Sequence, residues 1–299
     1  MDDGTVGPMS TRRGPATGYR VAPTGAAAAV GLLMSVQPLH AQPPPAGSNR
    51  TVNVNYVYAA NLGFGSYSLA GLSADVFTLP LGHTVPLGPE GGWRLRLTLP
   101  VQLGLYSFRA TDVDGTPIKI NQQSLAVLPG VELQVPLARN VVLKPFAQAG
   151  VGHAFGATSG ANAFIYTVGI RSVVQWQVGQ YTLSLGNALL YAGDRASNFS
   201  ESYFAIEGGF ELRRPLGLIL HGVEPDIGVY VADYYYPKPL RFSRFLRDPL
   251  KVSNQGEVGF SIGSARPLRM ALLESARIGI GYVFGGGLSV WHVNFGFPF

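Results

Sequence analysis

The sequence lacks cysteine, and it has no long apolar run after its first 41 positions. Without cysteine the chain can form neither a disulfide framework nor a thiolate metal site. Its histidines are scattered and no H-E-x-x-H pattern occurs, so we expect no metal site and no cofactor. Because no run of 18 apolar residues follows Ala41, no transmembrane helix is expected there.

Charge is also scarce, since charged residues make up 13% of the 299-residue chain against 46% hydrophobic and 11% aromatic residues. That composition is too apolar for a disordered chain. Together with 39 glycines, and with Tyr and Phe dominating the aromatic residues, it favours an all-β protein. About 250 residues are enough for one closed barrel, so the length does not require two domains.

The N-terminal segment has the features of a secretory signal peptide. Arg12, Arg13 and Arg20 precede an apolar run over 25–36, and Ala41 supplies a small residue at the expected cleavage position. The run is too short to span a bilayer as a helix. We therefore predict a cleaved signal peptide over 1–41, export through the general secretory pathway, a disordered lead-in over 42–50 and one barrel domain over 51–299.

Alternation of apolar and polar residues characterises the rest of the chain. From Trp93 to Leu105 every odd position is apolar, while the even positions include Arg94, Arg96 and Gln102. Successive side chains of a strand point to opposite faces, so one face is apolar and the other is polar or small. A water-soluble sandwich carries its charge outward, whereas here charge is scarce and the apolar face is broad. This is the pattern of barrel strands with lipid outside and a polar interior.

The recurrence of this pattern predicts a single antiparallel transmembrane β-barrel of twelve strands, with ten and fourteen strands as alternatives. The expected strands cover about 51–64, 72–86, 93–107, 122–136, 140–153, 162–176, 181–192, 201–213, 222–236, 252–264, 275–284 and 288–299. An even number places both termini on the periplasmic side of a Gram-negative outer membrane. We expect outside loops over 109–121, 193–200 and 237–251, and a longish inside connection over 265–274.

The final strand has aromatic residues at alternate positions and ends in phenylalanine. This arrangement resembles the recognition signal of outer-membrane barrels, which the barrel-assembly machinery reads. We assign this assembly signal to Trp291, Phe295, Phe297 and Phe299.

Residues 51–299 resemble the solitary outer-membrane β-barrels related to the autotransporter translocator domain. The resemblance is carried by the stretches that begin at Tyr56 (YVYAANLGFGSY), Lys144 (KPF) and Gly186 (GNALLYAG), and by the terminal GFPF. It implies a barrel of roughly twelve strands and does not imply secretion of anything. Because only 42–50 would precede the first strand, we expect no passenger domain and no helical linker filling the pore.

Ionisable residues of both signs project toward the predicted lumen. They are Arg94, Arg96, Glu132, Lys144, Arg171, Glu207, Glu211, Glu224, Asp226, Glu257, Arg277 and His292. One interpretation is a lining that sets the selectivity of a pore or forms a ligand pocket. The other is a mutually neutralising ion-pair network that fills a narrow lumen, because paired charges are tolerable in a dry interior and lone ones are not.

The segment 237–251 carries five basic residues and one acidic residue. Its basic residues are Lys238, Arg241, Arg244, Arg247 and Lys251. In a loop above the outer leaflet they would contact lipopolysaccharide phosphates, where each contributes roughly 1 kcal/mol. The alternative is an ordinary solvated loop. Nucleic acid is not an expected partner, because the predicted location is wrong for it.

The sequence favours a non-enzymatic, integral outer-membrane barrel with a narrow or plugged pore for small polar solutes. A lipid-modifying esterase and a surface interaction protein acting through extracellular loops are the alternatives. For the esterase, residues 259–263 match G-x-S-x-G, but they lie within an alternating strand rather than in a strand–turn–helix elbow. The other candidate pairing is His153 with Ser159.

Overall fold

The computed structural model describes residues 64–69, 72–89, 92–111, 117–156, 161–196, 200–219, 223–242, 250–270 and 273–296. The chain divides into Met1–Ala46, which lies outside these residues, and Gly47–Phe299, which contains all of them. The predicted signal peptide and lead-in therefore lie outside the described residues, as does nearly all of the first expected strand.

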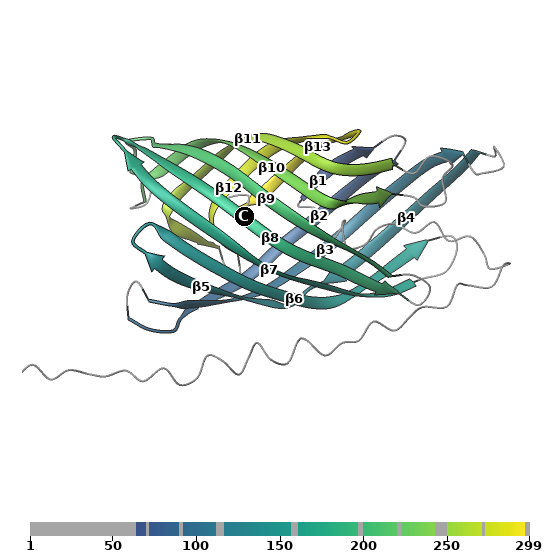
Figure 1. Ribbon diagram of the computed structural model, residues 1–299, viewed down its shortest axis with the longest axis horizontal. Coiled ribbons are helices and arrows are strands. Elements are labelled where there is room, and N and C mark those ends of the chain that lie inside the picture. The colour runs from purple at the N-terminus through teal and green to yellow at the C-terminus, as the bar shows by residue number, and fades with distance from the viewer. Residues whose placement is uncertain are drawn as a thin grey trace, which may run out of the picture. The chain divides into compact units, whose positions relative to one another are not determined.

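Thirteen strands make up a single antiparallel sheet in the described part of the chain (Figure 1). They are β1 (Phe64–Leu69), β2 (Leu72–Pro86), β3 (Arg94–Thr111), β4 (Pro117–Val127), β5 (Gly130–Ala138), β6 (Val141–Gly156), β7 (Ala161–Val178), β8 (Tyr181–Ala196), β9 (Ser200–Pro215), β10 (Pro225–Phe242), β11 (Leu250–Met270), β12 (Leu273–Gly285) and β13 (Leu288–Phe295). Among the residues placed, none belongs to a helix with the length and apolar character needed to cross a membrane.

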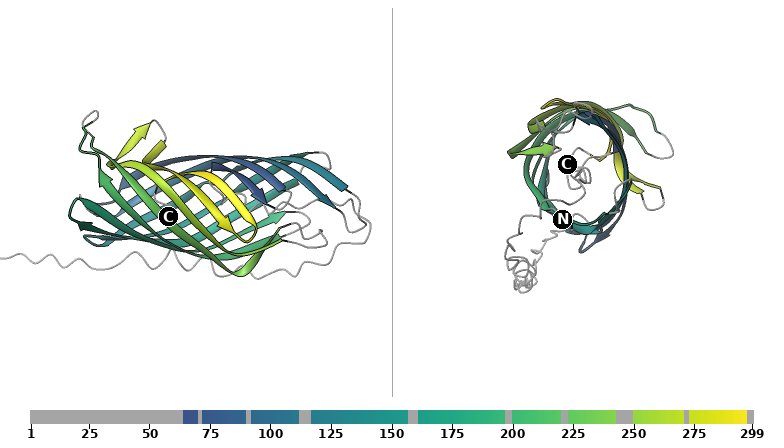
Figure 2. Two further views of the ribbon diagram at one scale, coloured as in Figure 1. Left: turned by 90° about the horizontal axis from the view of Figure 1, so that it is seen from above. Right: turned by 90° about the vertical axis from the view of Figure 1, so that its right-hand side faces the viewer.

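The sheet closes on itself because β1 pairs with both β2 and β13. The view along the barrel in Figure 2 shows the strands as a ring, and the side view shows them crossing it obliquely. β4 and β5 both pair with β3 on one side and with β6 on the other, so they are two parts of one interrupted strand. The prediction of a closed, all-β, antiparallel barrel of twelve strands is confirmed.

The interruption between β4 and β5 falls at Leu128 and Pro129. Two backbone hydrogen bonds keep the sheet continuous across it: the Leu128 amide donates to the Pro100 carbonyl at 3.1 Å, and the Ala149 amide donates to the Pro129 carbonyl at 3.0 Å. Pro100 and Pro129 have no amide hydrogen, so each can take part in the ladder only as an acceptor. The missing donors explain why this strand breaks into two.

Four hairpins extend further than the sequence pattern predicts. β3 continues to Thr111 and β4 begins at Pro117, and β8 continues to Ala196 and β9 begins at Ser200, so the expected loops over 109–121 and 193–200 are partly strand. The other two hairpins depart further from the prediction. β10 continues to Phe242 and β11 begins at Leu250, so strand covers 237–242 and 250–251 of the expected loop over 237–251. β11 and β12 likewise continue through most of the expected connection over 265–274. The predictions over 237–251 and 265–274 failed for the same reason. The strand register shifts between Tyr235 and Leu240 in one hairpin and between Gly263 and Leu268 in the other, and strand pairing resumes beyond each shift.

The two faces of the sheet differ in exposure as their sequences differ in polarity. In β9, Phe204, Ile206, Phe210 and Leu212 are 38% to 52% exposed, whereas Glu211 between them is 1% exposed. The exposed apolar residues therefore form the outer face, and the buried alternate residues form the enclosed face. Part of the enclosed face is apolar, in a cluster made of Phe146, Leu190, Ala192, Tyr203, Ala205, Tyr236, Leu240 and Val252.

Candidate functional site on the enclosed face of the barrel

The strand register places most of the predicted lumen residues on the enclosed face. Eleven of the twelve occupy strand positions that alternate with exposed outer-face residues: Arg94, Arg96, Glu132, Lys144, Arg171, Glu207, Glu211, Asp226, Glu257, Arg277 and His292. Arg94 is the first residue of β3 and is exposed at the rim. Glu224 differs from the rest, because β10 begins one residue later and leaves Glu224 exposed in the preceding connection.

One group, the Glu257 cluster, centres on a carboxylate that is 1% exposed. Tyr230 donates a 2.6 Å hydrogen bond to Glu257 Oε1, and Tyr234 donates a 2.5 Å hydrogen bond to Oε2. His292 Nε2 lies 2.6 Å from the same Oε1, and the Asn294 amide donates to the Tyr230 hydroxyl at 2.7 Å. The cluster joins β10, β11 and β13 across the enclosed face. A buried carboxylate held by several donors is tolerable, whereas a lone one is costly.

Glycines on the enclosed face make room for this cluster. A side chain added at Gly281 of β12 would collide with the Glu257 carboxylate and the Tyr230 hydroxyl, and one at Gly259 of β11 would collide with the Tyr230 ring. Glu257 can therefore reach across β12 to His292 because the intervening strand has no side chain at that point. The polar contacts of the cluster therefore depend on the glycines beside them.

A second group, the Arg277 cluster, lies on β9 to β12. Arg277 Nε lies 2.9 Å from Glu211 Oε1, and its Nη2 donates to Asp226. Arg213 Nε lies 3.5 Å from Glu211 Oε2, and the Ser261 hydroxyl donates to Glu211 at 2.5 Å. Two guanidinium groups thus face two carboxylates, which compensates the charges inside the barrel.

A third group, the Arg171 cluster, lies on the other side of the ring. Arg171 Nη1 lies 3.2 Å from Glu132 Oε2, and the guanidinium sits 3.7 Å from the centre of the Phe146 ring. Gln134 donates to the other Glu132 oxygen at 3.1 Å. Lys144 pairs with Arg171 in the strand register, which places two cations side by side. This side of the barrel therefore has more basic than acidic groups.

Sequence reasoning missed several members of these clusters, among them Arg213, Tyr230, Tyr234, Ser261 and Asn294. The alternation along each strand could have identified some of them. Arg213 lies two residues after Glu211, and Tyr230 and Tyr234 lie four and eight residues after Asp226, so alternation places them on the same face. An alternation of apolar and polar residues does not identify tyrosine, because its ring is apolar while its hydroxyl is a donor on a polar face.

The predicted lipopolysaccharide contacts are only partly described. Lys238 and Lys251 are exposed on β10 and β11, and Arg241 pairs with Lys251 in the register. Arg244 and Arg247 lie outside the described residues. In the predicted assembly signal, Trp291 and Phe295 lie on the outer face of β13 and are 63% and 37% exposed, whereas Phe297 and Phe299 lie outside the described residues.

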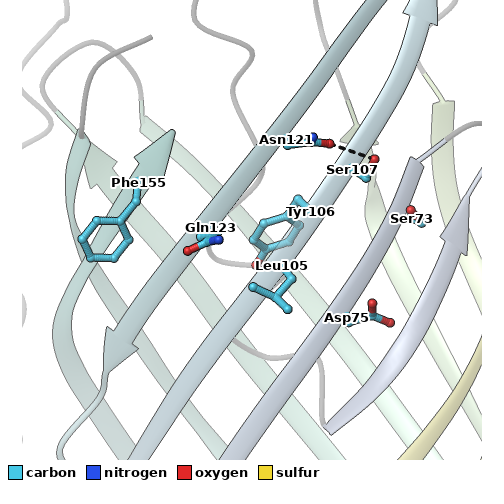
Figure 3. Close-up of a pocket in the computed structure, with 8 residues that line it drawn as sticks. All are labelled: Ser73, Asp75, Leu105, Tyr106, Ser107, Asn121, Gln123 and Phe155. Carbon is cyan, nitrogen blue, oxygen red and sulfur yellow. Dashed lines mark hydrogen bonds between the residues drawn. The ribbon is translucent and has the colours of Figure 1, made fainter. Parts of the chain in front are cut away.

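A cavity of about 500 Å³ lies against β2, β3, β4 and β6. Figure 3 shows its lining, in which the Ser107 hydroxyl donates to Asn121 at 3.1 Å; the lining residues are Ser73, Asp75, Leu105, Tyr106, Ser107, Asn121, Gln123 and Phe155. Most of them lie on the outer face. Among the described residues that line it, none is a histidine and none carries a basic side chain.

The features considered for hydrolysis do not assemble into a catalytic group within the described residues. The G-x-S-x-G stretch lies inside β11, and its Ser261 is buried on the enclosed face against Glu211. His153 Nδ1 lies 2.6 Å from Asn162 Oδ1, and its ring packs against Phe155. Ser159 lies outside the described residues. No three His, Asp or Glu side chains among the placed residues are arranged to hold a metal ion.

No protein-family profile and no curated protein matches the sequence. Among solved structures, the chain is similar to the translocator domain of the autotransporter NalP from Neisseria meningitidis, with 11% identity, a TM-score of 0.57, and coverage of 77% of this chain and 82% of that chain. The β domain of the Bordetella autotransporter BrkA matches at 10% identity and a TM-score of 0.48, covering 77% of this chain and 92% of that chain. The likeness to the NalP domain agrees with the resemblance found in the sequence, and it shows that this chain has the fold of an autotransporter translocator barrel.

Proposed function

We propose that this protein is an integral β-barrel of a Gram-negative outer membrane that acts as a narrow pore for small polar solutes and has no catalytic activity. The outer face supports a membrane location, because large apolar side chains such as Phe260, Trp291 and Ile280 are 68%, 63% and 57% exposed. Contiguous apolar surface of this kind is unfavourable in water and favourable in lipid. The autotransporter-like fold suggests the same location.

The main observation that supports a pore function is the pairing of charges along the enclosed face. The Glu257, Arg277 and Arg171 clusters place acidic and basic groups in mutual contact inside the ring. A barrel that served only as a rigid wall would be more stable with apolar residues at these positions, because buried ion pairs contribute little to stability. Glu211, Glu257 and Arg277 are at most 4% exposed, which supports a narrow passage rather than a wide aqueous channel.

The experiment is single-channel recording of the full-length chain after refolding into a planar bilayer. We expect discrete conductance steps that are small compared with those of a wide porin. In a second set of recordings, neutral solutes of increasing size are added to the bath, and we expect only the smallest to enter the pore and lower its conductance. A barrel that is folded and inserted by heat-modifiable gel mobility, yet passes no current, would contradict the pore.

We further propose that the chain is exported by the general secretory pathway and inserted by the barrel-assembly machinery through its final strand. We also propose that Lys238, Arg241, Arg244, Arg247 and Lys251 contact lipopolysaccharide. The exposed positions of Lys238 and Lys251 near the tip of the β10–β11 hairpin support this contact. No observation favours the esterase, because the described neighbours of His153 on its own face are Leu125, Val151, Phe155 and Asn162.

A further inference from the structure

Charges on the enclosed face are unevenly distributed around the ring. Among the paired strand positions whose side chains are described, β3 to β7 carry four basic residues and one acidic residue, for a formal charge of +3: Arg94, Arg96, Lys144 and Arg171, with Glu132. β8 to β12 carry six acidic and two basic residues, for a formal charge of −4: Asp194, Glu201, Glu207, Glu211, Asp226 and Glu257, with Arg213 and Arg277. We name these the basic sector and the acidic sector.

Part of the acidic sector faces the basic sector across the barrel, and the rest adjoins it at β7. In a closed ring of twelve strands, strands that are six places apart lie on opposite sides. Counting β4 and β5 as one strand, β3 lies opposite β10, and β7 lies opposite β13. β10 to β12, with Asp226, Glu257 and Arg277, therefore lie across the lumen from β3 to β6, while β8 and β9, which carry the other four acidic residues, lie between β7 and β10.

Local pairing does not remove this separation. Glu132 pairs with Arg171 inside the basic sector, and Arg277 pairs with Glu211 and Asp226 inside the acidic sector. Both sector charges already include these partners, so an excess of each sign remains after pairing. Some of the groups are also reachable from the lumen, since the side chains of Arg171 and Asp226 are 27% and 14% exposed.

We propose that this transverse separation of charge makes the pore selective for small zwitterionic solutes, which carry an ammonium and a carboxylate a few bonds apart. The inference rests on the proposed pore function. A zwitterion can direct its carboxylate toward the basic sector and its ammonium toward the acidic sector, so both of its charges are stabilised. A singly charged ion is attracted by one sector and repelled by the other. A neutral solute gains from neither.

The test compares four solutes of nearly equal size and different charge: alanine (zwitterion), lactate (anion), alaninamide (cation) and lactamide (neutral). Liposomes containing the full-length chain are swollen in each solute and the initial rates are compared. We expect alanine to enter about three- to tenfold faster than each of the other three, because favourable interactions at two sectors amount to ~1 kcal/mol in a partly hydrated lumen.

Variants of each sector should shift the selectivity in opposite directions. Arg96→Gln with Lys144→Gln should slow lactate relative to alaninamide, and Glu201→Gln with Glu207→Gln should do the reverse. Both should reduce the preference for alanine. The matched control is Arg195→Gln with Arg214→Gln, which removes two arginines from exposed outer-face positions and should change none of the ratios.

The possible outcomes separate the two proposals. Equal rates for alanine and lactamide in the unmodified protein would overturn the zwitterion selectivity while leaving the pore intact. Entry of none of the four solutes would overturn the pore and this inference with it. If one sector variant does not fold, as judged by gel mobility, the other sector variant and the four-solute comparison still test the zwitterion selectivity.

Discussion

Asn187 is a polar residue on the apolar outer face of the barrel. Its neighbours in the strand register are Ser172 of β7 and Gly208 of β9, and the next outer-face residue along β8, Leu189, is 45% exposed. If the outer face is embedded in lipid as we propose, the amide group has no water to bond with. Leaving it there costs free energy that an apolar side chain would not cost.

We therefore expect Asn187→Leu to stabilise the protein in a lipid bilayer by about 1–3 kcal/mol, the cost of an unsatisfied amide in apolar surroundings. The measurement is urea-induced unfolding in vesicles, followed by tryptophan fluorescence. The matched control is Leu189→Asn, two residues along the same face, which should lower the stability by a similar amount. A less stable Asn187→Leu protein would mean that the amide has a partner in the membrane.

At the scale of residues, the sequence predicted which face of the sheet most charged groups occupy, but not which of them contact one another. Alternation placed Glu257 and His292 on the enclosed face, because the side-chain period of a strand is fixed. Their contact depends on strand register and on the missing side chain at Gly281, and neither can be obtained from a single strand's sequence. Glu224 was misplaced because the exact start of β10 is decided by pairing, which local pattern does not report.

The interrupted strand formed by β4 and β5 depends on a glycine in the neighbouring strand. Gly150 of β6 lies opposite the break, where an added Cβ would collide with the Val127 carbonyl oxygen and come within 2.8 Å of Leu128 Cα. Both contacts are with backbone, which cannot rotate away. The close approach of β6 to the break is possible only without a side chain at this position.

Gly150→Ala should lower the unfolding free energy by about 1–3 kcal/mol, because the sheet must separate locally to fit the methyl group. The control is Gly152→Ala, two residues along the same face of β6, where the nearest atom is the mobile Ile165 Cδ1 at 3.0 Å. Urea midpoints of both variants should be compared with that of the unmodified protein. Equal midpoints for the two variants would contradict this role of Gly150.

At the scale of elements, alternation predicted the twelve-strand pattern well and the strand ends poorly. It failed where a strand changes register, as between Tyr235 and Leu240, because a shift breaks the period while the ladder continues. Prolines at 237 and 239 gave the segment the appearance of a loop. The hydrogen bonds that extend the hairpin come from β11, which the local sequence of β10 cannot reveal.

The whole barrel depends on the pairing of its first described strand with its last. Ser66 of β1 lies opposite Trp291 of β13, and both are exposed on the outer face. Because the protein has no cysteine, a pair of cysteines can be introduced at these positions without competing thiols. Directly opposed positions bring Cα atoms within the range that a disulfide spans.

We expect the double variant Ser66→Cys with Trp291→Cys to form a disulfide on mild oxidation, and the barrel to become resistant to heat-induced unfolding in detergent. Non-reducing gel mobility checks both. The control pairs Ser66→Cys with Ser289→Cys, which is displaced by two residues along β13 and should crosslink poorly. Efficient crosslinking of the displaced pair in place of the aligned one would mean a different register at the closure.

The closing pair has a kinetic consequence. Phe64 and Val293 are partners although more than two hundred residues separate them, so we expect this contact between the first and last described strands to form late. Until that moment β1 and β13 each present a row of unsatisfied backbone groups, which invites pairing with other chains. Folding through such distant contacts is slow. The strands between them can assemble hairpin by hairpin. Until β1 and β13 meet, however, their open edges must not pair with other chains. The rate of closure therefore decides between a monomeric barrel and an aggregate.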